Sequence, residues 1–224
     1  MNSSTTPTAT RQQLQAALQS LGLHLRGGWV PQLEDQLPAL ESGHAIAIVW
    51  MVGVVGSGFW PHFSRSGFYR DGLPDALDRW SAAIGNALAR QCGGRALFPF
   101  DGPPYLPFQR WADRAEATQT SPLLLRLHPR YGLWHAYRFA LALPTLAAAD
   151  AQALAEEHAA IRQTQLQPAL CTQCSGQPCL SACPVQAFTG TAYLLESCAA
   201  HLHSPSGAAC MESGCQSRHA CPHG

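Results

Sequence analysis

Lysine is absent from this chain of 224 residues, so all 14 basic residues are arginines, and they are balanced by 14 acidic residues. Only 12% of the residues are charged, and the formal net charge is zero. Proteins that bind nucleic acids usually carry a basic patch or stripe, and no such stripe occurs here. A nucleic-acid-binding surface is therefore not indicated.

A long hydrophobic run is also missing. The most apolar stretch, "AIAIVWMVGVVGSGFW" at residues 45–60, is too short to span a bilayer comfortably and is interrupted by three glycines. Its β-branched residues predict a buried strand followed by a turn. The N-terminal segment "MNSSTTPTATRQQLQAALQS" lacks the apolar core of a secretory signal. We expect a cytoplasmic protein with no membrane insertion.

Cysteine, in contrast, is plentiful and unevenly placed. Of the nine cysteines, Cys92 stands alone in the first part of the chain, and the other eight lie between Cys171 and Cys221. In a reducing compartment such a group is more typical of a metal site than of disulfides. All six tryptophans precede the group. We therefore predict a core domain at residues 1–165 and a cysteine-rich module at residues 166–224.

The hydrophobic pattern of the core domain predicts both helices and strands. Helices are expected at residues 11–22, 74–94 and 147–162, and strands at 45–55 and 95–100, with two further strands around a turn at Gly132. Because these elements do not follow a regular strand–helix–strand rhythm, the predicted fold class is α+β.

The first cysteine run, "CTQCSGQPCLSACP", contains Cys171, Cys174, Cys179 and Cys183, with gaps of two, four and three residues and a proline after the last cysteine. The bacterial ferredoxin run has gaps of two, two and three before a proline, and its fourth cysteine ligates the other cluster. Pro184 should stop the local helix and turn Cys183 away from the other three. The run thus follows the ferredoxin pattern with a two-residue insertion.

A second set follows and ends in another cysteine–proline pair. We assign one [4Fe–4S] cluster to Cys171, Cys174, Cys179 and Cys221, and a second to Cys183, Cys198, Cys210 and Cys215. Zinc bound by four thiolates, or one cluster beside a degraded second site, are the alternatives. Cys92 is interpreted as a small buried residue, and the histidines of the tail as solvent-facing or supporting groups.

With these residues, the chain resembles the cobalamin-dependent iron–sulfur family of epoxyqueuosine reductases and reductive dehalogenases. It is also similar to the cobalamin-processing proteins that share their core fold. The cysteine order carries the resemblance, together with "FPFDGPPYLPFQRWADRAE" and "HPRYGLWHAYRFALAL" upstream of it. The resemblance implies a nitroreductase-like core followed by a ferredoxin-like module with two [4Fe–4S] clusters.

The resemblance also implies a site. Asp101 matches the family's proposed proton donor, and Tyr131, Gly132, Trp134 and Arg138 would help to line a pocket for cobalamin. Taken alone, Asp101 is also ordinary turn chemistry, and Trp134 suits core packing. Arg138 lies in an apolar strand and needs a partner, either a carboxylate or a ligand.

Two main functions follow from this reasoning. One is an oxidoreductase that passes electrons from the clusters to a corrinoid, for corrinoid processing or for reduction of a small substrate. The other is a ferredoxin-like electron-transfer protein without its own catalytic site. Either would require an electron donor such as a flavodoxin, a ferredoxin or a reductase. A core that binds flavin beside structural or redox-sensing clusters is a third alternative.

Overall fold

The computed structural model describes residues 9–223, and the backbone divides them into two compact units. The first unit contains residues 9–116 and 136–161, and the second contains residues 117–135 and 162–223. Residues 1–8, the start of the N-terminal segment that lacks the apolar core of a secretory signal, lie outside the described residues. The second unit therefore combines the cysteine-rich tail with residues 117–135, a segment that the sequence had assigned to the core domain.

A four-stranded sheet forms the centre of the first unit. Its strand order is β1 (His24–Trp29), β2 (Ile48–Val55), β6 (His135–Leu143) and β3 (Arg95–Leu97). The pairs β1–β2 and β3–β6 are antiparallel. The Ala47 N–H donates to the Leu143 carbonyl oxygen at 2.8 Å, so β2 begins where β6 ends and these strands also run in opposite directions.

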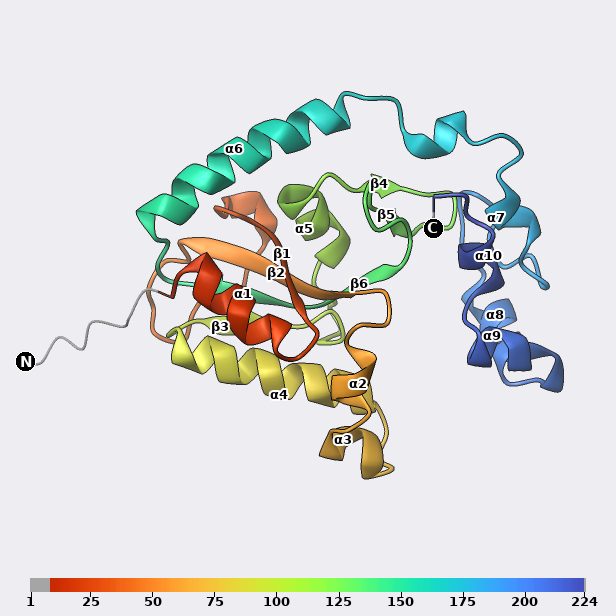
Figure 1. Ribbon diagram of the computed structural model, residues 1–224, viewed down its shortest axis with the longest axis horizontal. Coiled ribbons are helices and arrows are strands. Elements are labelled where there is room, and N and C mark those ends of the chain that lie inside the picture. Colours follow the sequence, from red (N-terminus) through yellow and green to blue (C-terminus); the bar gives the residue numbers. More distant parts are fainter. Residues whose placement is uncertain (1–8, 224) are drawn as a thin grey trace, which may run out of the picture. The chain divides into compact units, whose positions relative to one another are not determined.

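Helices cover both faces of this sheet. The long helices are α1 (Arg11–Gln19), α4 (Ala76–Gln91), α5 (Phe108–Ala115) and α6 (Ala148–Gln165), and the short ones are η1 (Leu33–Asp35), α2 (Trp60–Phe63) and α3 (Gly67–Arg70). Helices α1 and α4 lie on one face and α5 on the other (Figure 1).

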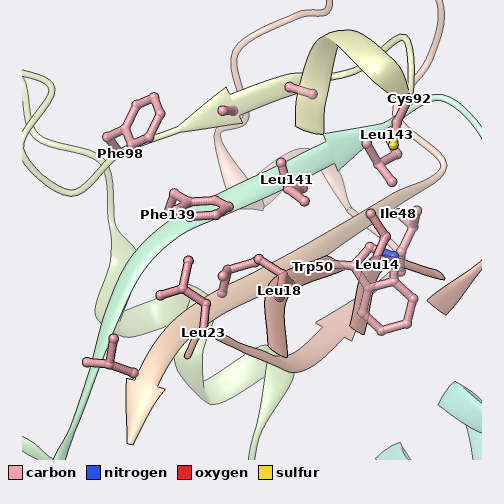
Figure 2. Packing of buried hydrophobic residues seen from close by; sticks show 14 of the residues in the cluster. Leu14, Leu18, Leu23, Ile48, Trp50, Cys92, Phe98, Phe139, Leu141 and Leu143 are labelled. Atoms are coloured by element: carbon pink, nitrogen blue, oxygen red, sulfur yellow. The ribbon is translucent and has the colours of Figure 1, made fainter. Parts of the chain in front are cut away.

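Alternation along the strands divides the core into two layers. In β2, Trp50 and Val52 belong to the layer under α1 and α4, whereas Val49 and Met51 belong to the layer under α5. Successive side chains of a strand point to opposite faces, so an all-apolar strand is expected where both faces are covered. Figure 2 shows the α1/α4 layer, including Cys92, which is 6% exposed and is a core residue, as predicted.

A buried polar network lies at the end of α5, just before the chain leaves the first unit at residue 117. Arg26 of β1 is 3% exposed and pairs with Glu116 at 2.8 Å. The Tyr137 hydroxyl donates to the same carboxylate oxygen, Oε2 of Glu116, at 2.5 Å. Burial and the Glu116 charge raise the pKa of Tyr137. The network joins β1, β6 and the end of α5 at one point.

The second unit consists of short elements around a small apolar cluster. It contains the hairpin β4 (Gln119–Thr120) and β5 (Arg126–Leu127), followed in the tail by η2 (Leu170–Gln173), α7 (Pro178–Ser181), α8 (Leu195–Leu202), η3 (Pro205–Gly207), α9 (Ala208–Glu212) and α10 (Gln216–His219). Leu123, Leu127 and Leu133 pack with Cys179 in this cluster. This packing explains why residues 117–135 belong with the tail.

The α+β prediction is confirmed, as are the main helices and the strand near residue 50. The two strands predicted around Gly132 are present as β5 and β6, although they do not pair with each other: β5 pairs with β4 in a separate two-stranded sheet, and β6 joins the main sheet. Across residues 9–223, none of the helices combines the length and the apolar character that crossing a bilayer would require.

Gly27 provides a test of this packing. A Cβ atom at Gly27 would lie 1.7 Å from the Ala115 carbonyl oxygen, so α5 or β1 would have to move. We expect Gly27→Ala to lower the free energy of unfolding by about 1–3 kcal/mol. The control Gly67→Ala, where a Cβ meets nothing within 4 Å, should change it by less than about 0.5 kcal/mol. Urea denaturation followed by tryptophan fluorescence measures both, and equal stabilities would contradict the packing described.

Candidate metal centre

The first cysteine run folds into two tight turns. Cys171 lies in η2, and Cys174 ends this 3-10 helix. Gly176 has a φ of +74°, a left-handed conformation that glycine adopts without strain. Pro178 then begins α7, where the missing N–H of proline costs nothing, and α7 carries Cys179. Cys183 comes after α7 and its C-cap residue, Ala182.

The C-terminal cysteines are spread over three short helices. Cys198 lies within α8, Cys210 within α9, and Cys215 is the residue before α10. Helix α9 packs against α8, and α10 packs against α7. Cys221 follows α10, whose contact with α7 brings the end of the tail back to the first run.

Four of the cysteines are electrostatic neighbours. Burial raises the pKa of the Cys171 thiol, and the thiols of Cys221, Cys179 and Cys174 raise it further. Burial, Cys221 and Cys174 raise the pKa of Cys179 in the same way. The structure therefore brings Cys221 to the first run, and these four are the residues that the sequence assigned to one cluster.

A second group gathers around Tyr193. A hydrogen bond with Cys198 is the main cause that raises the pKa of Tyr193 to about 12, and burial and the charges of Cys198, Cys215 and Cys183 add to it. Cys183 thus lies with the C-terminal cysteines, although it is only four residues from Cys179. Cys210 lies with its Sγ 3.9 Å from Nε2 of His201, a residue of α8. Cys221 thus lies near Cys171 and Cys179, whereas Cys183, Cys198 and Cys215 share Tyr193 as a neighbour.

All nine cysteines are free thiols. Within residues 9–223, no three side chains of histidine, cysteine, aspartate or glutamate surround a common point closely enough to hold a single ion. The cysteines are thus near neighbours that do not close into a single-ion cage.

Hydrogen-bond donors around the thiols test whether a cluster suits these residues. The Ala187 N–H donates to Sγ of Cys183 at 3.2 Å. Between Cys215 and Cys221, the hydroxyl of Ser217 and Nε of Arg218 are buried donors without a hydrogen-bond partner among the described residues. The sulfurs of an iron–sulfur cluster accept such bonds. The chemistry of the residues present therefore suits an iron–sulfur cluster.

Three of the expected pocket residues lie in the second unit. The Tyr131 ring stacks on His128 with centroids 4.4 Å apart, and Gly132 makes the turn with a φ of +54°. The Trp134 ring contacts two residues of α10: the Arg218 guanidinium lies 4.5 Å from its centroid, and the His219 ring lies 4.6 Å away. Trp134 thus holds the last turn of the cysteine module.

Arg138 lies in the first unit and has protein partners. It forms an ion pair with Asp78, and its Nε donates to Oγ of Ser81 at 3.0 Å. Both partners come from α4. Of the two kinds of partner that the sequence left open for Arg138, the structure supplies the carboxylate.

Asp101 is exposed in the turn after β3, and its N–H donates to the Phe98 carbonyl oxygen at 3.3 Å. This is the turn chemistry that the residue suggests on its own. Asp101 and Arg138 belong to one unit, and Tyr131, Gly132 and Trp134 to the other.

Two residues near the cysteines escaped the sequence reasoning. Tyr193 stands five positions before Cys198, and Arg218 is the only arginine after Arg162. A single basic residue between two candidate ligands is a signal that could have been noticed, since a buried cation needs a counter-charge.

No protein-family model matches this chain, and no curated protein is recognisably similar to it in sequence.

Asp78→Asn tests the role of Arg138. Removing the Asp78 charge leaves the Arg138 guanidinium, 13% exposed, without its ionic partner. We expect a loss of about 1.5–3 kcal/mol in unfolding free energy, towards the lower end because Asp78 is partly exposed. Chemical denaturation measures it, with the exposed Glu156→Gln as the control. Equal stability of Asp78→Asn and the wild type would show that Asp78 does not hold Arg138.

Proposed function

We propose that this chain is an iron–sulfur redox protein with two [4Fe–4S] clusters. One cluster would be held by Cys171, Cys174, Cys179 and Cys221, and the other by Cys183, Cys198, Cys210 and Cys215. The observation that carries the proposal is that Cys221 packs in one cluster with Cys171 and Cys179, whereas Cys183 shares Tyr193 as a neighbour with Cys198 and Cys215. Two-cluster ferredoxins exchange their fourth ligand in the same way.

The chemistry that such clusters supply when bound is one-electron transfer. Residues of the chain itself are placed to stabilise the negative charge of a reduced cluster. The backbone N–H of Ala187 donates to Sγ of Cys183. The leucines of residues 117–135 cover Cys179 and exclude water from it. Each feature is independent of the spacing of the cysteines.

The first unit would be a nitroreductase-like sandwich, and the second a ferredoxin-like module. In the fuller form of the proposal, the first unit holds a corrinoid that accepts electrons from the clusters, and Asp101 donates a proton during corrinoid processing or the reduction of a small substrate. A flavodoxin, a ferredoxin or a reductase would be the electron donor. The support for this form is the resemblance in sequence.

The second candidate is an electron-transfer protein that has no catalytic site of its own. One observation favours it: side chains expected to line the corrinoid pocket are held by protein groups. Asp78 and Ser81 hold Arg138, and the Trp134 ring packs on Arg218 and His219. Under this proposal the first unit docks the redox partner.

Cysteine substitutions test the two-cluster proposal. Anaerobically purified wild-type protein should contain about eight iron and eight sulfide per chain. Cys174→Ala and Cys198→Ala each remove a ligand from one group, and each should lower the iron content to about four. Cys92→Ala is the matched control and should keep all the iron, because Cys92 lies in the core of the first unit. Stoichiometric zinc in place of iron would contradict the proposal.

Hydroxocobalamin distinguishes the two candidate functions. If the first unit holds a corrinoid, adding hydroxocobalamin to the reduced holoprotein should shift the corrinoid absorption bands and reduce the cobalt. Free hydroxocobalamin with the same reductant is the control. An unchanged spectrum would leave the electron-transfer protein as the function.

A further inference from the structure

A histidine side chain closes the turn that follows strand β5. His128 comes directly after β5, and its Nδ1 accepts hydrogen bonds from the backbone N–H groups of Arg130 at 3.0 Å and Tyr131 at 3.2 Å. The backbones of His128 and Gly132 also bond to each other in both directions, each at 2.9 Å. The side chain and the backbone of one residue therefore hold this turn together.

Neighbouring rings fix the His128 ring in place. It stacks on the Tyr131 ring, with centroids 4.4 Å apart and an interplanar angle of 22°. The His135 ring lies edge-on to it at a centroid distance of 5.8 Å, and Nε2 of His135 is 2.9 Å from the Arg126 carbonyl oxygen. Because the ring is held in this way, Nδ1 stays directed towards the two N–H groups.

This geometry suits only one form of the imidazole. A ring nitrogen that accepts hydrogen bonds carries no proton, so His128 must be the neutral tautomer with its proton on Nε2. In the protonated ring both nitrogens are donors, and a proton on Nδ1 would point at two further N–H groups. Protonation of His128 therefore replaces two attractive contacts by repulsive ones.

The charges around the ring oppose its protonation as well. Residues 117–135 contain no aspartate or glutamate, and the acidic residues of the tail are Glu196 and Glu212, which are exposed on α8 and α9. The titratable and charged groups near the ring are Arg126, Arg130, Tyr131 and His135. The Arg130 guanidinium lies 5.4 Å from the centroid of the same Tyr131 ring on which His128 stacks. A nearby positive charge disfavours a second one.

The turn positions part of the apolar cover of the cysteine-rich module. Leu127 and Leu133 stand on either side of it, are 1% and 2% exposed, and pack with Cys179. The Trp134 N–H donates to the Tyr131 carbonyl oxygen at 3.0 Å, and the Trp134 ring contacts two residues of α10. Opening of the turn would therefore release side chains that hold the module.

We propose that His128 is a pH-sensitive latch of the second unit. The neutral ring keeps the turn of residues 128–132 closed, and protonation of the ring opens it. An unconstrained histidine takes up its proton at about pH 6.5. The closed turn leaves Nδ1 unprotonated and the open turn does not, so the stability of the turn is present above that pH and is lost as the pH falls below it. The latch goes beyond the two-cluster function and does not depend on it.

Amide hydrogen exchange of the full-length protein, as purified, tests the latch. Protection factors corrected for the intrinsic effect of pH on exchange should fall at Arg130 and Tyr131 when the pH is lowered. Because one proton is taken up, we expect a fall of about tenfold for each pH unit below the titration of the ring. The Trp134 amide should lose protection with them, whereas the amides of β2 should not.

The variant His128→Asn separates the hydrogen-bond acceptor from the proton. The Oδ1 atom of asparagine can accept from the same backbone N–H groups, as in an Asx turn, and the amide does not titrate. We expect His128→Asn to keep the protection and to lose its pH dependence. His128→Phe keeps a ring but has no acceptor, and should lose the protection at every pH. His62→Asn, at an exposed position in α2, is the control and should behave like the wild type.

Nitrogen-15 NMR of histidine-labelled wild-type protein adds a measurement that needs no variant. At neutral pH, the His128 ring should carry its proton on Nε2. A proton on Nδ1, protection of Arg130 and Tyr131 that does not change with pH, or a pH response that persists in His128→Asn would each overturn the inference. None of these results depends on whether the protein contains iron, so the latch and the two-cluster function can fail separately.

Discussion

Four neighbouring cysteine thiols in a partly buried loop cannot all ionise unless a cation lies between them. In the second unit, burial and the neighbouring thiols raise the pKa of Cys171 and Cys179, which favours their protonated forms. A bound cluster reverses this balance, because its iron takes thiolates and the protons are released. Under the proposed function, the binding energy of the metal would therefore become folding energy for the loops that carry the cysteines.

The architecture of the second unit follows from this constraint. Its elements are short, and its apolar cluster is small, with Leu123, Leu127 and Leu133 as the main contributions from outside the tail. Small modules of this kind usually need a metal or disulfides in addition to their core. Trp134 and Arg218 add a further link between residues 117–135 and the last helix. The segment 117–135 thus serves the cysteine module, while the strand that follows it serves the sheet of the first unit.

Much of the fold could be predicted from the sequence wherever its hydrophobic pattern is strong. Strand β2 is apolar throughout because the sheet is covered on both faces, and α4 shows its apolar face and its glycine stop. The cysteine–proline pairs predict that Cys183 and Cys221 are exchanged between two ligand sets, and this stays a prediction. That the cysteines ligate iron stays a prediction.

Other features depend on contacts that the sequence does not display. Strand β1 contains Arg26, Gly27 and Gly28, a poor strand signal, but Gly27 is needed where α5 approaches and Arg26 has Glu116 as its partner. Residues 117–135 were assigned to the wrong unit because their leucines pack against residues more than forty positions away. The pocket residues were predicted from a resemblance to a family. Such a resemblance suggests roles for Arg138 and Trp134, but it does not predict which side chains they contact.

The central claim is that two iron–sulfur clusters lie in crossed cysteine groups. Anomalous diffraction at the iron edge, from crystals grown without oxygen, tests it most directly. The account predicts two iron centres, one bounded by Cys171, Cys174, Cys179 and Cys221 and the other by Cys183, Cys198, Cys210 and Cys215. A single centre, a zinc edge, or Cys183 bound with Cys171, Cys174 and Cys179 would contradict it.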